Sequence, residues 1–147
     1  MIMEYGCIPY TFTDCDGFYG CSFPEAKASG KLVFGQLPIL DIDGKHQISQ
    51  SGSQNRYVAS LVKKPGFYPT DPEKLAFCDM IHETHQDLWQ IMPIVNLWSG
   101  KNRDQKKEEF FNTTLPSKLP ALVKLLGDKW FFCGDEVTYA DFAIFHI

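Results

Sequence analysis

The sequence predicts a mixed α/β domain followed by an all-helical domain, and three observations support this. Residues 34–61 follow the order strand, tight turn, strand and helix. Residues 63–72 contain three prolines and a glycine, so they cannot continue a helix and instead mark a linker. From residue 73 onward, apolar side chains recur at steps of three and four residues, which is typical of helices. We therefore expect domains at residues 1–62 and 73–147.

The composition limits the partners that this protein is expected to bind. With 44% hydrophobic and 14% aromatic residues, a chain of 147 residues can bury a substantial core. The net charge of −4 gives no electrostatic reason to expect nucleic acid or an anionic membrane as a partner. The sequence has no long apolar run and no signal-peptide layout at its first residues. We expect a cytoplasmic protein without a nucleic-acid or membrane partner.

The five cysteines are odd in number and scattered, and no two of them form a CxxC pair. A disulfide framework is therefore not expected, and free thiols in a reducing compartment are the simpler interpretation.

The first 30 residues predict short elements. Residues 1–5 are typical of the last turn of a helix that stops at Gly6. Residues 8–13 predict a short strand, with Pro9 near its start, and residues 14–20 predict a loop. Residues 23–28 predict a short helix.

The stretch FGQLPILDIDG, followed by QS, carries the strongest functional signal. Asp43-Gly44 predicts a tight hairpin turn, and a helix is expected from Ser51 onward. If the Leu37-Pro38 bond is cis, the main chain of Leu37 faces outward and can pair with an extended peptide. The N–H groups at the helix N-terminus and the Ser51 hydroxyl suit a carboxylate. Together these features predict a site for a small, extended, anionic peptide.

These motifs resemble the glutathione-binding half of the cytosolic glutathione transferases. The resemblance implies a thioredoxin-like first domain with a cis-proline before its third strand. It also implies that Leu37 pairs with the cysteinyl backbone of glutathione and that Gln50 and Ser51 hold the γ-glutamyl carboxylate. Gln36 and Pro38 complete the implied site, with glutathione as co-substrate and no metal.

Lys27 is a further candidate for binding glutathione. The segment FPEAK resembles the WPEIK segment of the sigma class, and Lys27 takes the place of a lysine that contacts glutathione there. Two extra residues lie between this segment and Gly35, so Lys31 remains an alternative source of the positive charge.

The second domain is expected to contain a helix over residues 73–97, thinned or kinked late by Pro93, and a second helix over residues 104–126. Pro116 predicts a bend or break near residues 115–117. Thr138 and Asp141 form a capping box at the start of a last helix. That helix is apolar almost all round, so we expect burial on every side. The segment GDEVTYADF also resembles the start of the transferases' central helix.

A polar cluster lies on the first long helix, and its members are Asp79, His82, Glu83, His85 and Asp87. Its histidines are three residues apart and do not match HExxH, so a solvent-facing or intersubunit polar face is the favoured interpretation over a metal site. The resemblance places Asp87 where a sigma-class aspartate reaches the glutathione of the neighbouring subunit, with Gln86 and Glu83 as alternatives. This implies a homodimer.

Compared with the transferases, both domains are expected to be incomplete: the first strand and the later helices have no counterpart here. No residue inherits the role of activating the glutathione thiol, so the catalytic residue is unknown. Two functions remain open: a sigma-like transferase that conjugates glutathione to small electrophiles, and a non-catalytic binding or structural module, as in lens crystallins of this fold. Thiol-disulfide exchange requires a cysteine that opens the first helix, and no candidate is evident.

Overall fold

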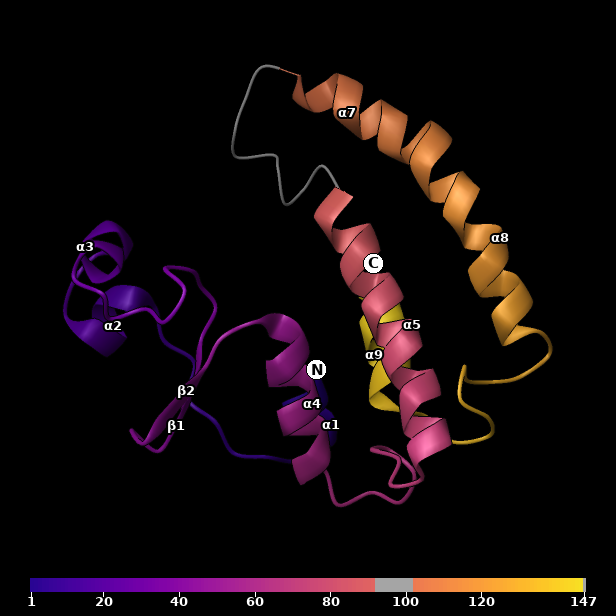
Figure 1. The fold of residues 1–147 in the computed structure, drawn as a ribbon, viewed down its shortest axis with the longest axis horizontal. Helices are drawn as coiled ribbons and strands as arrows, with labels where there is room; N and C mark the ends of the chain where they lie inside the picture. The colour runs from indigo at the N-terminus through magenta and orange to yellow at the C-terminus, as the bar shows by residue number, and fades with distance from the viewer. Residues whose placement is uncertain (92–101, 147) are drawn as a thin grey trace. The chain divides into compact units, whose positions relative to one another are not determined.

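A computed structural model describes residues 1–91 and 102–146 (Figure 1). The chain divides into two compact units, Met1–Lys64 and Pro65–Ile147. The first unit contains, in order, α1 (Ile2–Tyr5), α2 (Cys15–Tyr19), α3 (Phe23–Ala28), β1 (Leu40–Ile42), β2 (His46–Ile48) and α4 (Ser51–Leu61). The second contains α5 (Pro72–Ile91), α7 (Arg103–Glu109), the π-helical segment η2 (Phe110–Thr114), α8 (Leu115–Leu126) and α9 (Tyr139–Phe145). None of the described helices could cross a membrane.

Strands β1 and β2 form an antiparallel hairpin, with Leu40 opposite Ile48. Asp43 and Gly44 both have positive φ, at 51° and 69°, as a type I′ turn requires. The Gly44 N–H donates to Asp41 Oδ2 at 2.7 Å, which holds the turn closed. The predicted hairpin at Asp43-Gly44 is therefore confirmed.

The strand predicted over residues 8–13 is wrong, because this segment is irregular. Helix α1 ends with Cys7 in the left-handed region at φ 51°, and the Ile8 N–H donates back to Met3 O at 2.9 Å. This pattern is the Schellman ending of a helix. The N–H of Ile8 is therefore already used, and Pro9 has none, so two successive ladder donors are missing.

Helices α7 and α8 and the segment η2 follow one another without a break from Arg103 to Leu126. Of the bend or break predicted near residues 115–117, a break is absent, and the π-helical segment η2 ends at Thr114, two residues before Pro116. A proline removes a hydrogen bond to the preceding turn, and π-helical turns accommodate such irregularities. The part of the first long helix predicted beyond residue 91, Pro93 included, lies outside the described residues.

Helix α9 packs beside α5 and forms the core of the second unit with it (Figure 1). The fully buried side chains of this core include Phe67, Cys78, Ile81, His82 and Tyr139. The burial predicted for α9 on every side is wrong on one face, because Phe145 is 84% exposed. Within the described residues, α5 is the principal partner of α9, and a helix buries only the face that its partner covers.

Cys78 and Cys133 form a disulfide, which corrects the expectation that all five cysteines are free thiols. Cys78 lies on α5, and Cys133 lies in the loop before α9. Their Cα atoms are 6.3 Å apart although 55 residues separate them in sequence. The packing of α9 on α5 brings them together, and no spacing rule in the sequence reports such a contact. Cys7, Cys15 and Cys21 are free.

Candidate functional site

The main chain at Leu37 is open to an extended ligand. The Leu37-Pro38 bond is cis, as the resemblance led us to expect. Within the described residues, no hydrogen bond reaches the N–H or C=O of Leu37. The Leu37 side chain is 43% exposed, and both Gln36 and Pro38 are exposed. The segment therefore presents backbone donors and acceptors that a peptide could pair with as an added strand does.

The side chain of Gln54, the fourth residue of α4, ties this segment to the end of β2. Gln54 Nε2 donates to Pro38 O at 2.9 Å and to Ile48 O at 2.8 Å. An amide nitrogen has two protons, so both donors are used. Gln54 was not among the residues predicted from the sequence. On its own, a glutamine one turn after Ser51 is indistinguishable from any polar helix residue.

The N-terminus of α4 provides the second half of the candidate site. Gln50 precedes the helix with φ 70°, a conformation uncommon for a residue with a side chain, and its carbonyl accepts the Gln54 N–H at 3.0 Å. Ser51 is the first helical residue, and both Gln50 and Ser51 are exposed. The first turn of a helix has N–H groups without intrahelical partners, which suits an anionic group. Through Gln54, this turn is joined to Pro38.

The structure places Lys27, rather than Lys31, beside the segment that leads to Leu37. Gly35 has φ 64°, and a Cβ atom there would lie 3.2 Å from Cε of Lys27. The Lys27 side chain therefore lies against the backbone at Gly35, directly before Gln36. Lys31 Nζ instead donates to Tyr19 O at 3.2 Å.

Asp87 is exposed on α5, so it belongs to the second unit. The polar cluster around it differs from the predicted solvent-facing or intersubunit face. His82 and His85 are 0% and 5% exposed, respectively. Their rings pack within the second unit: His82 lies 5.8 Å from Tyr139 and His85 lies 5.9 Å from His146, centroid to centroid. The interpretation as a polar face is therefore wrong for these two histidines, which help to join α5 to α9.

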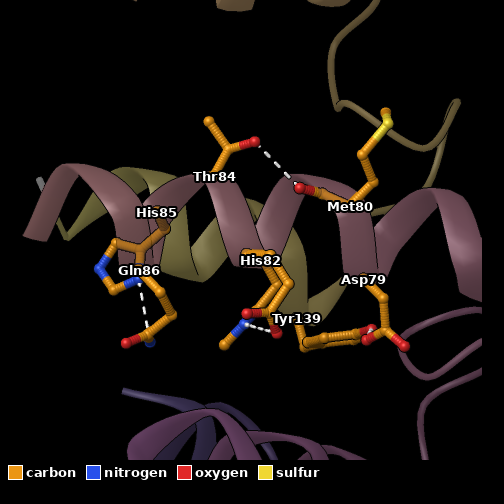
Figure 2. A network of polar contacts seen from close by, with 8 residues as sticks. Asp79, Met80, His82, Thr84, His85, Gln86 and Tyr139 are labelled. Carbon is orange, nitrogen blue, oxygen red and sulfur yellow. Dashed lines mark hydrogen bonds and ion pairs between the residues drawn. The ribbon is translucent and has the colours of Figure 1, made fainter.

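A hydrogen bond between Tyr139 and Asp79 extends this network (Figure 2). The buried Tyr139 hydroxyl donates to Asp79 Oδ1, and Thr84 Oγ1 donates to Met80 O at 3.0 Å. Figure 2 shows Asp79, His82 and His85 along one helix, with Tyr139 beside Asp79. Among the described residues, no group of three or more His, Cys, Asp or Glu side chains could hold a metal ion. The contacts of this network hold α9 against α5.

Burial controls the charge of His85. Removal from water, together with repulsion by His82 and His146, lowers the pKa of His85 to about 4. The imidazole is therefore neutral near pH 7.

Comparison with known proteins shows a similarity to glutathione S-transferases. The model for "Glutathione S-transferase, C-terminal domain" matches residues 86–147. Hematopoietic prostaglandin D synthase from Gallus gallus is 38% identical over 127 residues, covering 84% of this chain and 58% of that protein. Glutathione S-transferase Mu 1 from Mus musculus is 32% identical over 138 residues, covering 94% of this chain and 60% of that protein. The chain is therefore similar to glutathione S-transferases over most of its length.

Solved structures of glutathione S-transferase family members have the same fold. Rat hematopoietic prostaglandin D synthase, complexed with a quinoline, superposes with a TM-score of 0.71 at 27% identity, covering 97% of this chain and 67% of that chain. The Pi-class transferase of Onchocerca volvulus gives a TM-score of 0.75 at 26% identity, covering 98% and 65%. These neighbours support a thioredoxin-like first part followed by a helical part. The chain spans 58–60% of the length of the two curated relatives named above.

Proposed function

We propose that this chain binds glutathione in the first unit, as a sigma-like glutathione transferase does, and that the whole protein conjugates the glutathione thiol to small electrophiles. The observation that carries this proposal is the pairing of an open main chain at Leu37 with the exposed N-terminus of α4. Gln54 joins the two features through its hydrogen bond to Pro38 O. Glutathione is a small peptide with carboxylates. Its backbone can pair with the main chain at Leu37, and a carboxylate can bind at the N-terminus of α4.

In this proposal, the cysteinyl backbone of glutathione pairs with the N–H and C=O of Leu37. The γ-glutamyl carboxylate accepts hydrogen bonds from the first turn of α4 and from the Ser51 hydroxyl, and Gln50 contacts the same end. Gln36 and Pro38 line the site on either side of Leu37. Lys27, which lies against Gly35, supplies a positive charge for a carboxylate of the ligand.

Transfer would then proceed on the bound peptide. The thiolate attacks the electrophilic carbon, a carbon–sulfur bond forms, and the leaving group departs. A site that stabilises the thiolate raises the concentration of the nucleophile at neutral pH. No residue of this chain is assigned as the thiol-activating group.

The proposal includes a two-fold homodimer in which Asp87 reaches glutathione bound to the second subunit. Asp87 is exposed on α5 and could therefore serve a partner. Sedimentation velocity measures the assembly directly. A chain that stays monomeric at every concentration, yet binds glutathione with an affinity unaffected by Asp87→Ala, would refute this part of the proposal.

Isothermal titration with glutathione tests the site, using Ser51→Ala and Ser53→Ala as matched variants. Ser53 is exposed two residues further along the same helix. We expect Ser51→Ala to weaken binding roughly 10-fold or more, because a hydrogen bond to a charged group contributes about 1.5–3 kcal/mol. Ser53→Ala should leave the dissociation constant unchanged. Equal affinities for the two variants would contradict the assignment of Ser51.

Turnover with an aromatic chloride separates the two functions that the family offers. Conjugation by the whole protein, lost together with glutathione binding in Ser51→Ala, supports the transferase. Glutathione binding without conjugation supports a non-catalytic module instead.

A further inference from the structure

A cluster of two thiols and an ammonium group lies in the first unit, apart from the residues assigned to glutathione. It consists of Cys15, Cys21 and Lys31, and the two cysteines are half-buried free thiols. A cysteine is reactive where it is partly accessible and has a positive group beside it. The cluster provides both conditions and a second thiol.

The two thiols stand at the two ends of the short helix α2. Gly20 follows the helix with φ 67° and ψ 24°, and its N–H donates to Asp16 O at 2.7 Å. This is the left-handed ending of a helix, in which the residue after the glycine folds back over the first turn of a short helix. Cys21 is that residue, and Cys15 is the first residue of α2. The chain therefore turns at Gly20, and Cys21 lies near enough to Cys15 for its charge to act on that thiol.

Lys31 is fixed against Cys21. Its Nζ donates to Cys21 Sγ at 3.5 Å and to Tyr19 O at 3.2 Å. The Tyr19 hydroxyl in turn donates to Gln47 Oε1 at 3.0 Å and lies 3.3 Å from Lys31 O, which connects the cluster to β2. A donor directed at a sulfur stabilises the negative charge that this atom carries as an attacking thiolate and as a leaving group.

The two thiols differ in their surroundings. Burial raises the pKa of Cys15, and Cys21, Asp14 and Asp16 raise it further, against a smaller opposite effect of Lys31. The ammonium group of Lys31 lies against Cys21 Sγ at 3.5 Å, so attack is assigned to Cys21 and the second reaction to Cys15.

We propose that Cys21 is a site of thiol–disulfide exchange that accepts a small-molecule disulfide such as glutathione disulfide, and that Cys15 resolves the product. Thiol-disulfide exchange at a cysteine opening the family's first helix had no candidate in the sequence. In this proposal the attacking thiol is instead Cys21, which follows helix α2. The inference does not depend on the proposed glutathione site.

The two steps balance as follows. The Cys21 thiolate attacks one sulfur of the disulfide, the sulfur–sulfur bond of the small molecule breaks, and a mixed disulfide with Cys21 forms while one thiolate leaves. The Cys15 thiolate then attacks Cys21 Sγ, and the second thiolate leaves. Each leaving thiolate takes up one of the two protons lost by the cysteines. The two cysteines are oxidised to one disulfide, and one small disulfide is reduced to two thiols.

The experiment incubates the full chain with glutathione disulfide and, separately, with uncharged hydroxyethyl disulfide, and maps the products by peptide mass after alkylation. We expect a Cys15–Cys21 link, formed at least about tenfold faster than modification of the exposed Cys7. Cys15→Ser should stop the reaction at the mixed disulfide on Cys21. Modification of Cys7 at the same rate as Cys21 would overturn the proposal, because exposure alone would then explain the reaction.

Two lysine variants test the role of Lys31. Lys31→Met should slow the first step about tenfold, whereas Lys45→Met, which removes an equal charge from an exposed turn of the same unit, should not change it. Equal rates for the two variants would overturn the proposed role of the ammonium group. Ser51→Ala should react at the wild-type rate with both disulfides. This separates a failure here from a failure of glutathione binding.

Discussion

Gln54 Nε2 lies 2.9 Å from the carbonyl oxygen of Pro38, which precedes it by 16 residues. The same nitrogen lies 2.8 Å from Ile48 O, so one amide group joins the segment before β1 to the end of β2. Gln54 itself stands on α4, whose first turn forms half of the candidate site. This side chain therefore sets the separation between the open main chain at Leu37 and the helix N-terminus.

Replacement of Gln54 by alanine should weaken glutathione binding roughly 5- to 30-fold. The carbonyls of Pro38 and Ile48 lose their donor, and an unsatisfied acceptor costs about 1–3 kcal/mol. The segment before β1 moves to relieve this cost, and the movement disturbs the site. Titration calorimetry measures the dissociation constant, and Gln105→Ala on the exposed surface of α7 is the control. A lower melting temperature with unchanged affinity would show that Gln54 only stabilises the fold.

The unfolding free energy should fall as the pH drops from about 6.5 to about 4, because of His85. Its pKa in the folded protein is about 4, below the ordinary value of 6.5. Between these values, the unfolded chain binds a proton that the folded chain does not, so acid favours unfolding. The loss approaches about 3 kcal/mol and is complete below pH 4.

Urea unfolding at several pH values tests this dependence, with His85→Leu removing the titrating group. The variant should have a shallower slope of unfolding free energy against pH across this range. His46→Leu, at an exposed position on β2, should keep the wild-type slope. If His85→Leu leaves the slope unchanged, then other groups cause the acid sensitivity.

Features that depend on neighbours in sequence could be predicted. The hairpin turn at Asp43-Gly44, the short helix over residues 23–28 and the start of α4 at Ser51 follow from turn chemistry and periodicity. The capping box of Thr138 with Asp141 is another example, because its two members are one helical turn apart. Each of these features is decided within a few residues.

Contacts between distant segments could not be predicted. Nothing local indicates that Gln54 reaches Pro38 or that Tyr139 bonds Asp79 across 60 residues. The burial of His85 depends on α9 packing against α5, so a polar pattern on one helix led to the wrong interpretation. The position of the Lys27 side chain against Gly35 likewise depends on the path of the backbone between them.

Asp141→Ala should lower the unfolding free energy by roughly 2–4 kcal/mol. Asp141 Oδ1 accepts the Phe132 N–H at 2.8 Å, and Oδ2 accepts the N–H and hydroxyl of Thr138, both at 2.8 Å. Alanine therefore removes a helix cap and leaves donors in the core without acceptors. Thermal and urea unfolding measure the loss. Asp135→Ala, at an exposed position nearby, should change the stability by less than about 0.5 kcal/mol.

Reduction of the Cys78–Cys133 disulfide should lower the unfolding free energy by about 2–4 kcal/mol. The bond closes a long loop, with a sequence separation of 55, and cross-linking a long loop reduces the entropy of the unfolded chain. Peptide mapping without reductant should show the two cysteines linked, and urea unfolding with and without reductant measures the effect. A Cys78→Ala/Cys133→Ala double variant should unfold at the same urea concentration in both conditions, because it has no bond to reduce. If the wild-type chain also unfolds at the same urea concentration with and without reductant, then the disulfide contributes nothing to stability. The packing of α9 on α5 would then hold this loop alone.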